Sequence, residues 1–565
     1  MPIQRIPLSQ PIETRDGLLN TDSRCVNGYF ETRNGVREFV KRPGLVNHTV
    51  SPALPTSKGQ GMAWFKGNLY AVVSDVLYKI DPVTYASTVV GSLSGSGKTC
   101  YFTQTLNDGY LFIQDQVNGY LVNGSTGAFS QITNDKVATV TIITGGTNYT
   151  SGDTVTFSAP PSGVTATGTV QITGGVITDI TITNPGSGYV TAPSITINTS
   201  TGAGFSGNAL LNFFPTGGLV PGAIFLDSYI AVGTPGGRIY TSNVGDPTIW
   251  SPLDYITAEA EPDNSVGIAK HLNYILDFGQ WSTEFFYDAG NAIASPLASA
   301  PSYRLEIGCA NGDSIASFEQ SVFWVGTSKT VGPSVFGVDG TAPIKLSTVY
   351  IDRILQNSNL QDITSYGFKI NGHVFYVLTL HDLNVTIVYD VGEKMWYQWT
   401  MWAIGTVDSG VPGIYGEQYF RPSYYAGYGS TYYLLDDDNG KLYTILDHYY
   451  NDAGAPIYYR AVTDVIDNGT TKRKFYNRVE IVGDKVAATM QIRHSDNDYK
   501  SYSPYRPVDL NLTRPQTYQN GAARRRSWEF LCTDNAPLRL DSAEIDFDIG
   551  ELENEGSAAP TQYRR

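Results

Sequence analysis

Residues 68–80 read NLYAVVSDVLYKI, and this stretch indicates how most of the chain folds. Apolar and polar side chains alternate on both sides of Ser74-Asp75, as they do in two antiparallel strands joined by a tight turn. The pattern recurs, most clearly at residues 109–122, 229–240, 373–390 and 432–445. In the last of these the turn contains Asn-Gly, the strongest short-range hairpin signal. The sequence therefore predicts an all-β protein whose repeated hairpins form the blades of a β-propeller, with stacked β-sandwiches as the alternative.

The composition of the chain also favours short strands joined by turns. Hydrophobic residues make up 41% of the 565 residues and charged residues only 16%, and the chain holds 38 Tyr and 58 Gly. Tyr favours half-buried pleated surfaces, and Gly favours tight turns. Helical patterns are short, at about Gln10–Asn20 and near Asp352–Asp362. The length predicts two to four domains.

Residues 137–210 differ from the rest of the chain and contain an internal repeat. They are almost free of charge and rich in Thr, Gly, Val and Ile. Residues 141–149 (TIITGGTNY) correspond to residues 181–189 (TITNPGSGY) at an offset of 40, and 154–157 correspond to 194–197. Two copies of one supersecondary unit are expected to share a single small core. We therefore predict a two-copy β-repeat domain, the insert, placed at a loop tip of the propeller.

The other segments complete the predicted domain organisation. Residues 56–136 and 211–456 carry the two parts of the propeller, on either side of the insert. Residues 457–550 hold longer strands with basic residues between them, and we expect a C-terminal β-sandwich platform there. Residues 1–55 are expected to pack on the platform or the propeller, and residues 551–565 form a polar tail.

The formal net charge of the chain is −15, from 38 basic and 53 acidic residues. Proteins that grip nucleic acid neutralise its phosphates with a basic face, and this chain has no basic excess. A negative wall could still surround DNA without gripping it. The sequence has no run of about 18 apolar residues, and its start lacks a basic-then-apolar signal pattern. We therefore expect that the chain does not span a membrane and that it is synthesised in a host cytosol.

The residue patterns that carry catalysis, metal binding or cofactor binding are missing from the sequence. The six histidines form no HExxH or HxH motif. The cysteines, Cys25, Cys100, Cys309 and Cys532, form no CxxC pair, so we expect buried thiols and no zinc site. No GxxxxGK[ST] loop, strand-linked GxGxxG or GxSxG elbow occurs. The sequence therefore predicts no catalytic, metal or cofactor residues and no enzyme.

Two acidic regions come nearest to a chemical site. Residues 436–440 read DDDNG, but an EF-hand that starts at Asp436 would have Gly440 at position five and Asp447 at position twelve, and the required Gly at six and Glu at twelve are absent. We therefore expect a polar hairpin tip. A glycosidase would need two carboxylates that converge in the fold. The candidates for that pair are Glu259, Glu261, Asp263 and Glu284.

Two basic clusters stand out, Arg524-Arg525-Arg526 and Lys472-Arg473-Lys474. Such clusters can contact nucleic acid. Because the net charge is −15, we instead favour a place at a subunit interface or on a solvated rim that faces acidic neighbours.

A series of short motifs runs in order along the chain. Near the N-terminus they are Met1–Gln4, Val26–Tyr29, Arg42–Leu45, Gly61–Ala63 and the pair Leu69-Tyr70 and Leu77-Tyr78. The central stretch has Tyr240–Ser242, Trp250-Ser251, the acidic Ala258–Asp263, Trp281–Phe286, Gly308-Cys309 to Val325, and Val388–Trp396. In this shared order they resemble the tail nozzle proteins of short-tailed bacteriophages, also called packaged-DNA-stabilisation proteins. The likeness covers most of the chain except the insert, which the family pattern does not require.

The resemblance implies a structural role in the virion tail. Such proteins are similar to one another in forming a six-fold ring below the portal and its adaptor ring, with a β-propeller and a β-sandwich platform in each subunit. The ring carries the DNA channel, helps retain packaged DNA and meets tail fibres, spikes or a needle. We therefore expect a homo-hexamer that binds the head-to-tail adaptor ring and fibre, spike or needle proteins, and that touches genomic DNA transiently. The competing interpretation is a receptor- or glycan-binding propeller of a tail fibre or adhesin, whose exposed Tyr and Trp would stack on sugars.

Overall fold

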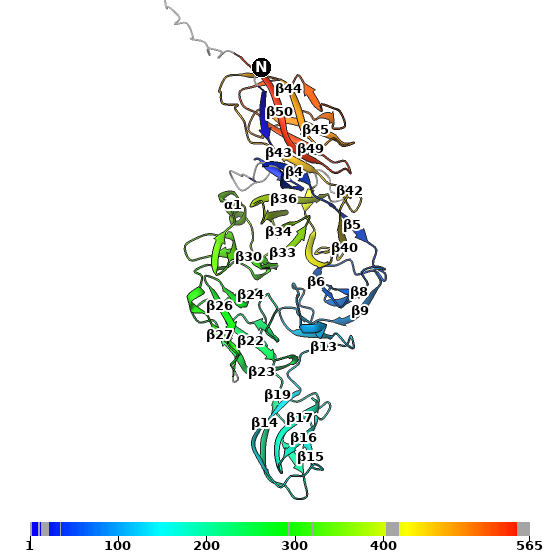
Figure 1. Cartoon of the computed structure of the whole chain (residues 1–565), viewed down its shortest axis with the longest axis vertical. Helices are drawn as coiled ribbons and strands as arrows, with labels where there is room; N and C mark the ends of the chain where they lie inside the picture. The colour runs from blue at the N-terminus through cyan, green and yellow to red at the C-terminus, as the bar shows by residue number, and fades with distance from the viewer. Residues whose placement is uncertain are drawn as a thin grey trace, which may run out of the picture. The chain divides into compact units, whose positions relative to one another are not determined.

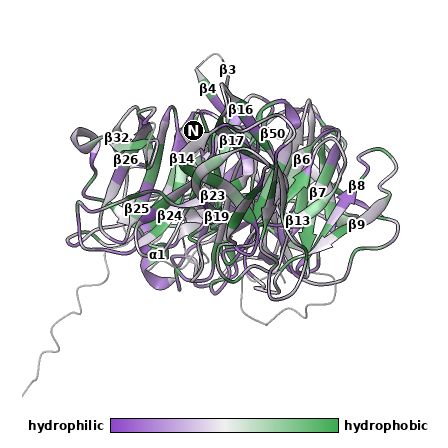
Figure 2. Ribbon diagram, turned by 90° about the horizontal axis from the view of Figure 1, so that it is seen from below, coloured by the Kyte–Doolittle hydropathy of each residue, from purple (hydrophilic) through white to green (hydrophobic). Residues whose placement is uncertain are grey.

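The computed structural model describes residues 3–8, 12, 22–33, 35–291, 294–318, 320–402 and 417–550. Strands make up 55% of the chain and helices 3%, and the sheets have a β-propeller arrangement, which confirms the predicted fold class. The chain divides into two compact units, Gln60–Gly312 and Met1–Gly59 with Asp313–Arg565. Figure 1 labels the elements of both units. Figure 2 shows that the strands carry both hydrophobic and hydrophilic residues, as expected for sheets whose two faces differ.

The unit Gln60–Gly312 holds four-stranded sheets in which each strand is antiparallel to the next along the chain, the form of a propeller blade. The first two sheets are β6 (Gly59–Phe65), β7 (Asn68–Val73), β8 (Val76–Ile80), β9 (Ser87–Ser92), and β10 (Tyr101–Gln104), β11 (Tyr110–Gln114), β12 (Gly119–Asn123), β13 (Phe129–Gln131). The next two are β20 (Ile224–Leu226), β21 (Tyr229–Gly233), β22 (Arg238–Asn243), β23 (Asp246–Thr257), and β24 (Ser265–His271), β25 (Tyr274–Gly279), β26 (Thr283–Asp288), β27 (Leu297–Ser299). Neighbouring sheets share apolar cores; Phe112 of β11 and Trp250 of β23, for example, lie with ring centroids 6.3 Å apart.

The predicted hairpins form where turn residues occur. The stretch 68–80 is β7 and β8, and Ser74 and Asp75 at its turn have φ of 53° and 58°, the left-handed backbone of a type I′ turn. The acidic tip 436–440 is a hairpin turn as predicted: Asp436 Oδ1 accepts from the N–H groups of Asp438 (2.9 Å) and Asn439 (3.3 Å). The same side-chain-capped turn recurs at Asp81, Asp115, Asn123 and Asp390.

The insert consists of strand pairs nested one inside another. The pairs are β14 (Val137–Thr147) with β19 (Ala203–Leu211), β15 (Thr154–Phe157) with β18 (Ile195–Asn198), and β16 (Thr167–Thr173) with β17 (Val176–Asn184). Their buried side chains form one core that includes Tyr149 and Tyr189, one from each copy of the repeat.

These two tyrosines link the copies by an exchange of hydrogen bonds. The Tyr149 hydroxyl accepts from the N–H of Phe205 (3.1 Å), in the second half of the insert. The Tyr189 hydroxyl accepts from the N–H of Ala166 (2.8 Å), in the first half. Each copy therefore satisfies a backbone N–H group of the other. The glycines three residues before the tyrosines both have φ of 68°, and a Cβ on either would come within 2.9 Å of the tyrosine ring.

The attachment of the insert, which we call the neck, is a network of hydrogen bonds rather than a loose linker. The N–H of Asn212 donates to the carbonyl of Lys136 (2.8 Å), so the two ends of the insert lie side by side. The Asn212 side chain accepts from the N–H of Trp250 (2.8 Å) and donates to the carbonyl of Thr133 (3.0 Å). Asn134 makes two hydrogen bonds with the backbone two residues beyond Asn212 (2.6 and 3.0 Å).

The unit Met1–Gly59 with Asp313–Arg565 holds further meanders and two large sheets. Its smaller sheets contain β29 (Ala316–Phe318), β30 (Ser321–Thr327), β31 (Ser334–Asp339), β32 (Ala342–Lys345), and β38 (Pro422–Tyr428), β39 (Thr431–Asp436), β40 (Leu442–Leu446), β5 (Gly44–His48), β41 (Asn451–Asp452), β42 (Ala455–Pro456). One large sheet contains β3 (Gly28–Arg33), β4 (Val36–Lys41), β50 (Arg539–Ile549), β44 (Lys474–Gly483), β47 (Gln516–Tyr518), β1 (Ile3–Pro7) and β48 (Ala522–Ala523). The other contains β33 (Ile363–Ile370), β34 (His373–Leu380), β35 (Val385–Asp390), β36 (Met395–Trp402), β2 (Arg24–Val26), β43 (Tyr459–Val462), β49 (Ser527–Cys532), β45 (Thr489–Ser495), β46 (Arg506–Asp509) and β37 (Glu417–Tyr419).

Strands from the N-terminus complete sheets whose other strands come from the C-terminal part of the chain. β5 pairs with β40, β1 and β4 pair with β50, and β2 lies between β36 and β43. These pairs cover strand edges that would otherwise expose unpaired backbone groups.

One buried arginine holds these N-terminal strands together. Arg42, 1% exposed, makes a bidentate pair with Asp452 (2.9 and 2.5 Å). Its Nε donates to Asn27 Oδ1 (3.0 Å), and its remaining N–H groups donate to the carbonyls of Thr400 (2.9 Å) and Pro43 (3.2 Å). Two of the family-like motifs, Val26–Tyr29 and Arg42–Leu45, therefore meet at this residue.

The helix predicted near Asp352–Asp362 is present with different bounds. α1 runs from Val349 to Asn357, and the Oγ1 of Thr348 caps it by accepting from the N–H of Ile351. It ends early because Asp382 accepts from the Oγ of Ser358 (2.7 Å) and the N–H of the next residue (2.6 Å), which holds the chain extended. The predicted helix at Gln10–Asn20 (apart from residue 12) and the predicted tail at 551–565 lie outside the described residues. Every helix in the described part of the chain is too short or too polar to span a bilayer.

We expect Arg42→Ala to lower the free energy of unfolding by about 3–5 kcal/mol, because the Asp452 carboxylate would stay buried without its partner. Arg42→Lys should also destabilise, since an ammonium cannot make the bidentate contact. Urea denaturation followed by tryptophan fluorescence measures both. The control is Arg539→Ala, which removes an exposed ion pair with Asp484 and should cost less than about 1 kcal/mol. Equal losses in Arg42→Ala and Arg539→Ala would contradict this role of Arg42.

We also expect residues 137–211 to be removable. Because Lys136 and Asn212 are hydrogen-bonded, a short Gly-Ser bridge between them should leave the rest of the chain with an unchanged strand spectrum and cooperative melting. A matched variant keeps the insert and carries Tyr149→Phe and Tyr189→Phe. It loses three hydrogen bonds at about 1 kcal/mol each, since the Tyr189 hydroxyl also donates to the carbonyl of Ser158, and it should lower only the melting transition of the insert. Aggregation of the shortened chain would show that the insert is needed for folding.

Candidate functional site

The acidic loop Ala258–Asp263 packs against the hairpin between β25 and β26, and this pair forms the candidate site. Asp263 Oδ2 accepts from the N–H groups of Trp281 (2.7 Å) and Ser282 (3.2 Å). Glu284 Oε1 accepts from the N–H of Ala260 (2.8 Å). Two further family-like motifs, Ala258–Asp263 and Trp281–Phe286, are thus joined by reciprocal carboxylate-to-backbone hydrogen bonds.

Trp281 is displayed at the tip of this hairpin. Its side chain is 39% exposed although its backbone is clamped by Asp263. At Gly279 a Cβ would lie 2.4 Å from the Asp263 carboxylate, so only glycine lets the acid approach the turn. A large aromatic side chain held on a rigid turn loses little entropy when a partner covers it, which is typical of a binding hot spot.

A buried carboxyl group lies beneath the loop. Asp277 is 3% exposed, and it accepts from the Oγ of Ser265 (2.6 Å) and lies directly opposite Glu284 in the β25–β26 register. Burial, followed by the negative charges of Glu284 and Asp263, raises the pKa of Asp277 to about 7. Burial also raises the pKa of Glu284, against the opposing effects of the Ala260 N–H and Arg304.

Arg304 offsets part of this negative charge. Its guanidinium donates to the carbonyl of Ala260 (3.3 Å) and lies 3.4 Å from Glu261 and 2.5 Å from Glu306. The arginine is partly exposed, so these pairs contribute little to stability and mainly orient the loop.

The four proposed glycosidase carboxylates all lie in the acidic loop or in the hairpin packed against it. Asp263 and Glu284 accept from backbone N–H groups and Glu261 faces Arg304, so these carboxylates hold the loop against the hairpin. Glu259 lies exposed in the same loop. Sequence reasoning missed Asp277, whose one signal is an acid within an otherwise apolar strand, YILDFG.

Other predicted features are placed as follows. All four cysteines are buried and none is in a disulfide, which confirms the expected thiols. Among the residues that the structure describes, no group of three or more His, Cys, Asp or Glu is arranged to hold a metal ion.

The interface prediction for the basic clusters is wrong for their inward-facing members. Arg526 is 1% exposed, pairs with Asp496 (2.6 and 2.8 Å), and has its guanidinium carbon 4.3 Å from the ring centroid of Tyr476 and 5.1 Å from that of Trp528. Lys474 is buried, and its Nζ donates to two carbonyls of the preceding turn (2.6 and 2.9 Å). Both cations are therefore satisfied inside their own chain. The exposed members, for which the interface remains a prediction, are Arg524, Arg525, Lys472 and Arg473.

Comparison with known proteins gives the class first. Residues 194–448, which include the acidic loop and the tryptophan hairpin, match the family model described as bacteriophage P22 Gp10, beta-propeller. This match confirms the resemblance to the phage tail hub and packaged-DNA-stabilisation proteins. A particular relative is the tail hub protein gp10 of Salmonella phage P22, which is 23% identical over 163 residues, 28% of this chain. The aligned region spans 34% of that relative's length.

Solved structures with partial likeness include BamB from Moraxella catarrhalis, which is 10% identical with a TM-score of 0.35 and covers 72% of this chain and 98% of its own. The WD40 domain of Neurospora crassa Pan2 is 7% identical with a TM-score of 0.35 and covers 74% of this chain and 97% of its own. The designed Ika8 protein is 11% identical with a TM-score of 0.33 and covers 72% of this chain and 100% of its own.

We expect Asp277→Asn to stabilise the protein at pH 8 and to have no effect near pH 4. An aspartate that titrates near 3.8 when unfolded and near 7 when folded favours the folded state only while protonated, so stability falls as pH rises through this window. At pH 8 the neutral asparagine avoids a cost of up to about 4 kcal/mol. Thermal melting across pH 4–8 measures the difference. The exposed Asp339→Asn serves as control, and a gain from Asp277→Asn that does not change with pH would contradict the shifted titration.

Proposed function

We propose that this chain is a structural subunit of a phage tail nozzle. Copies of it would form a ring, a hexamer by the family resemblance, below the portal and adaptor, and this ring would line the DNA conduit and retain the packaged genome. Fibres, spikes or a needle would attach to it. The observation that carries the proposal is the family match over residues 194–448, which includes the clamped loop and hairpin.

The rigidity of the sheets supports a load-bearing role. Turns are capped by side chains, and the acidic loop is tied to the neighbouring hairpin by a carboxylate, as at Asp263 and Trp281. A conduit under internal pressure needs subunits that do not deform, joined by broad interfaces. We propose that the chain acts through these contacts and has no catalytic activity.

The charge of the chain suits a channel through which DNA slides. Six copies would carry about −90 (6 × −15). A wall that repels phosphates avoids the contacts that DNA would have to shed at every step. We therefore propose that the lumen of the ring is negative and that DNA touches it transiently and without sequence preference.

A second candidate function is a receptor- or glycan-binding propeller of a fibre or adhesin. The exposed Trp281 favours it, because an indole can stack on a sugar as well as dock in a protein pocket. The two functions differ in where the chain sits in the virion.

We expect the purified chain, mixed with the portal and adaptor proteins of its phage, to give rings on the tail axis in negative-stain micrographs. Trp281→Ala should reduce incorporation on the order of thirtyfold, the effect of losing a hot spot worth about 2 kcal/mol. Tyr428→Ala, which removes an aromatic that is 61% exposed in the other unit, is the control.

Micrographs in which the chain lies only at the tail periphery and forms no ring would refute the nozzle proposal and favour the adhesin. Ring formation that Trp281→Ala leaves unchanged would keep the nozzle and remove the hairpin from its contacts.

A further inference from the structure

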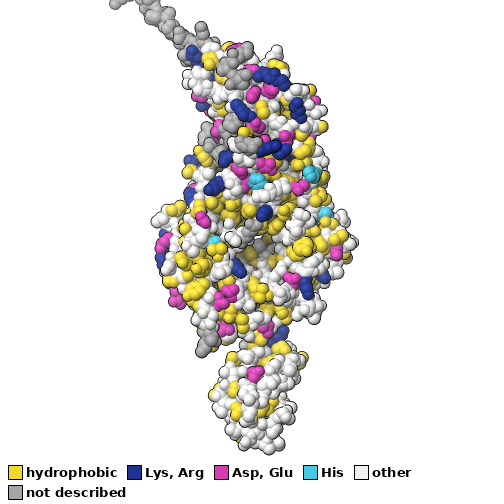
Figure 3. Space-filling view, viewed as in Figure 1, with side chains coloured by type: hydrophobic (Ala, Val, Ile, Leu, Met, Phe, Trp, Pro, Cys, Tyr) yellow, Lys and Arg dark blue, Asp and Glu magenta, His cyan; other side chains and the backbone are white. Residues whose placement is uncertain are grey.

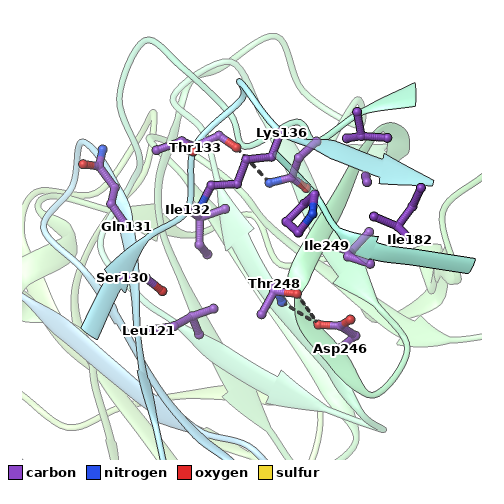
Figure 4. A pocket seen from close by; sticks show the side chains of 14 residues that line it. Leu121, Ser130, Gln131, Ile132, Thr133, Lys136, Ile182, Asp246, Thr248 and Ile249 are labelled. Carbon is purple, nitrogen blue, oxygen red and sulfur yellow. Dashed lines mark hydrogen bonds between the residues drawn. The ribbon is translucent and has the colours of Figure 1, made fainter. Parts of the chain in front are cut away.

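A cavity of about 370 Å³ lies at the neck, within the unit Gln60–Gly312 (Figure 4). Its walls come from the β12–β13 sheet, the start of β23, the two linkers of the insert and the end of β17. The volume is in the range of small-ligand pockets. The acidic loop Ala258–Asp263 and the hairpin of Trp281 are not among the residues that line it.

The walls of the cavity are preformed. Asn212, which lines it, is 6% exposed and bonds both to the linker at Thr133 and to β23 at Trp250. The pocket is therefore fixed by hydrogen bonds between the insert's linkers and the neighbouring sheet. Binding of a ligand would therefore not be opposed by the entropy cost of ordering the walls of the cavity.

The polar lining offers donors and acceptors without net charge. Lys136 brings an ammonium group, and it makes no ion pair within the described residues. Asp246 Oδ1 accepts from the N–H (2.9 Å) and Oγ1 (2.6 Å) of Thr248, and its second oxygen makes no hydrogen bond to a described residue. One positive and one negative group with hydroxyls and amides around them recognise a neutral ligand rich in hydroxyl groups.

The rest of the lining is aliphatic. Ile132, Ile182 and Ile249 face the cavity from three different segments. A sugar ring has a rim of hydroxyls and two faces of C–H groups, and it needs polar partners at the rim beside an apolar wall. The cavity combines both, whereas a purely apolar ligand would leave Asp246 and Lys136 desolvated.

The geometry points to a saccharide site: we propose that the neck cavity binds a neutral hexose unit, with Asp246 and Thr248 holding ring hydroxyls and Lys136 donating to an oxygen. That this hexose belongs to a bacterial surface polysaccharide rests on the proposed function in a phage tail. The insert then serves the protein by building one wall of this site. Figure 3 shows that the visible face of the insert carries hardly any charged side chains, and Asp153 and Asp179 are the charged residues between 137 and 210. The insert is therefore nearly free of charged groups that could repel or attract a polymer near the cavity.

Saturation-transfer NMR on the full chain tests the proposal, with methyl glycosides of glucose, galactose, mannose and N-acetylglucosamine as probes. We expect at least one neutral hexoside to bind, and we expect Asp246→Asn and Thr248→Val each to weaken it about tenfold or more. The control is Asp179→Asn, an exposed acid of the insert that accepts from the Oγ1 of Thr181 and lies outside the cavity. It should leave binding unchanged.

A second experiment tests whether the hexose is bound as a simple glycoside or as part of a bacterial polysaccharide. Glycan arrays that carry fragments of bacterial polysaccharide should retain the chain more strongly than the simple glycosides do. No binding of any neutral hexoside at millimolar concentration would overturn the proposal. Tighter binding of glucuronate than of its neutral parent would do the same, because it would make Lys136 an anion site. Melting curves of each variant establish that a loss of binding is not a loss of folding.

Discussion

A buried guanidinium needs a partner for each of its N–H groups, and Arg42 finds them in distant parts of the chain. Its five hydrogen bonds reach Asn27, Pro43, Thr400 and both oxygens of Asp452. The ring of Phe420 covers it, with a centroid 4.8 Å from the guanidinium carbon. Arg42 also stands where the chain leaves β4 for β5, that is, where it passes from one sheet to another. Few arrangements of these strands satisfy all of the donors, so this one residue fixes how the N-terminal segment closes the unit around it.

In the other unit the charged groups that hold the structure are carboxylates instead of a guanidinium, and their arrangement lowers stability. Asp263 and Glu284 gain backbone N–H groups, but Asp277 lies under them with its charge disfavoured by burial and by both neighbours. A core built only for stability would have an apolar residue there. Local violations of this kind concentrate at functional surfaces, and this one neighbours Asp263, whose carboxylate holds the turn of Trp281.

The sequence predicted elements whose signals are local and missed those that depend on distant partners. Turn residues such as Ser74-Asp75 marked the hairpins, and the 40-residue offset marked the insert. Nothing near Ile3–Pro7 reveals that its partner strand is Ser542–Asp546. The arginine cluster misled for another reason. A run of three like charges resembles one surface patch, yet Arg524 and Arg525 lie exposed in a bend while the next residue, Arg526, is buried. Asp277 was overlooked because a single acid in an apolar strand gives no pattern.

The crossed tyrosine bonds of the insert bear on whether either half of it could fold alone. With one copy alone, the Tyr149 hydroxyl and the N–H group of Ala166 would both lose their partners. Each half therefore supplies hydrogen bonds that the other half needs, and the insert is one folding unit rather than two independent modules. Because its two ends lie together at Lys136 and Asn212, this unit interrupts the chain at a single point.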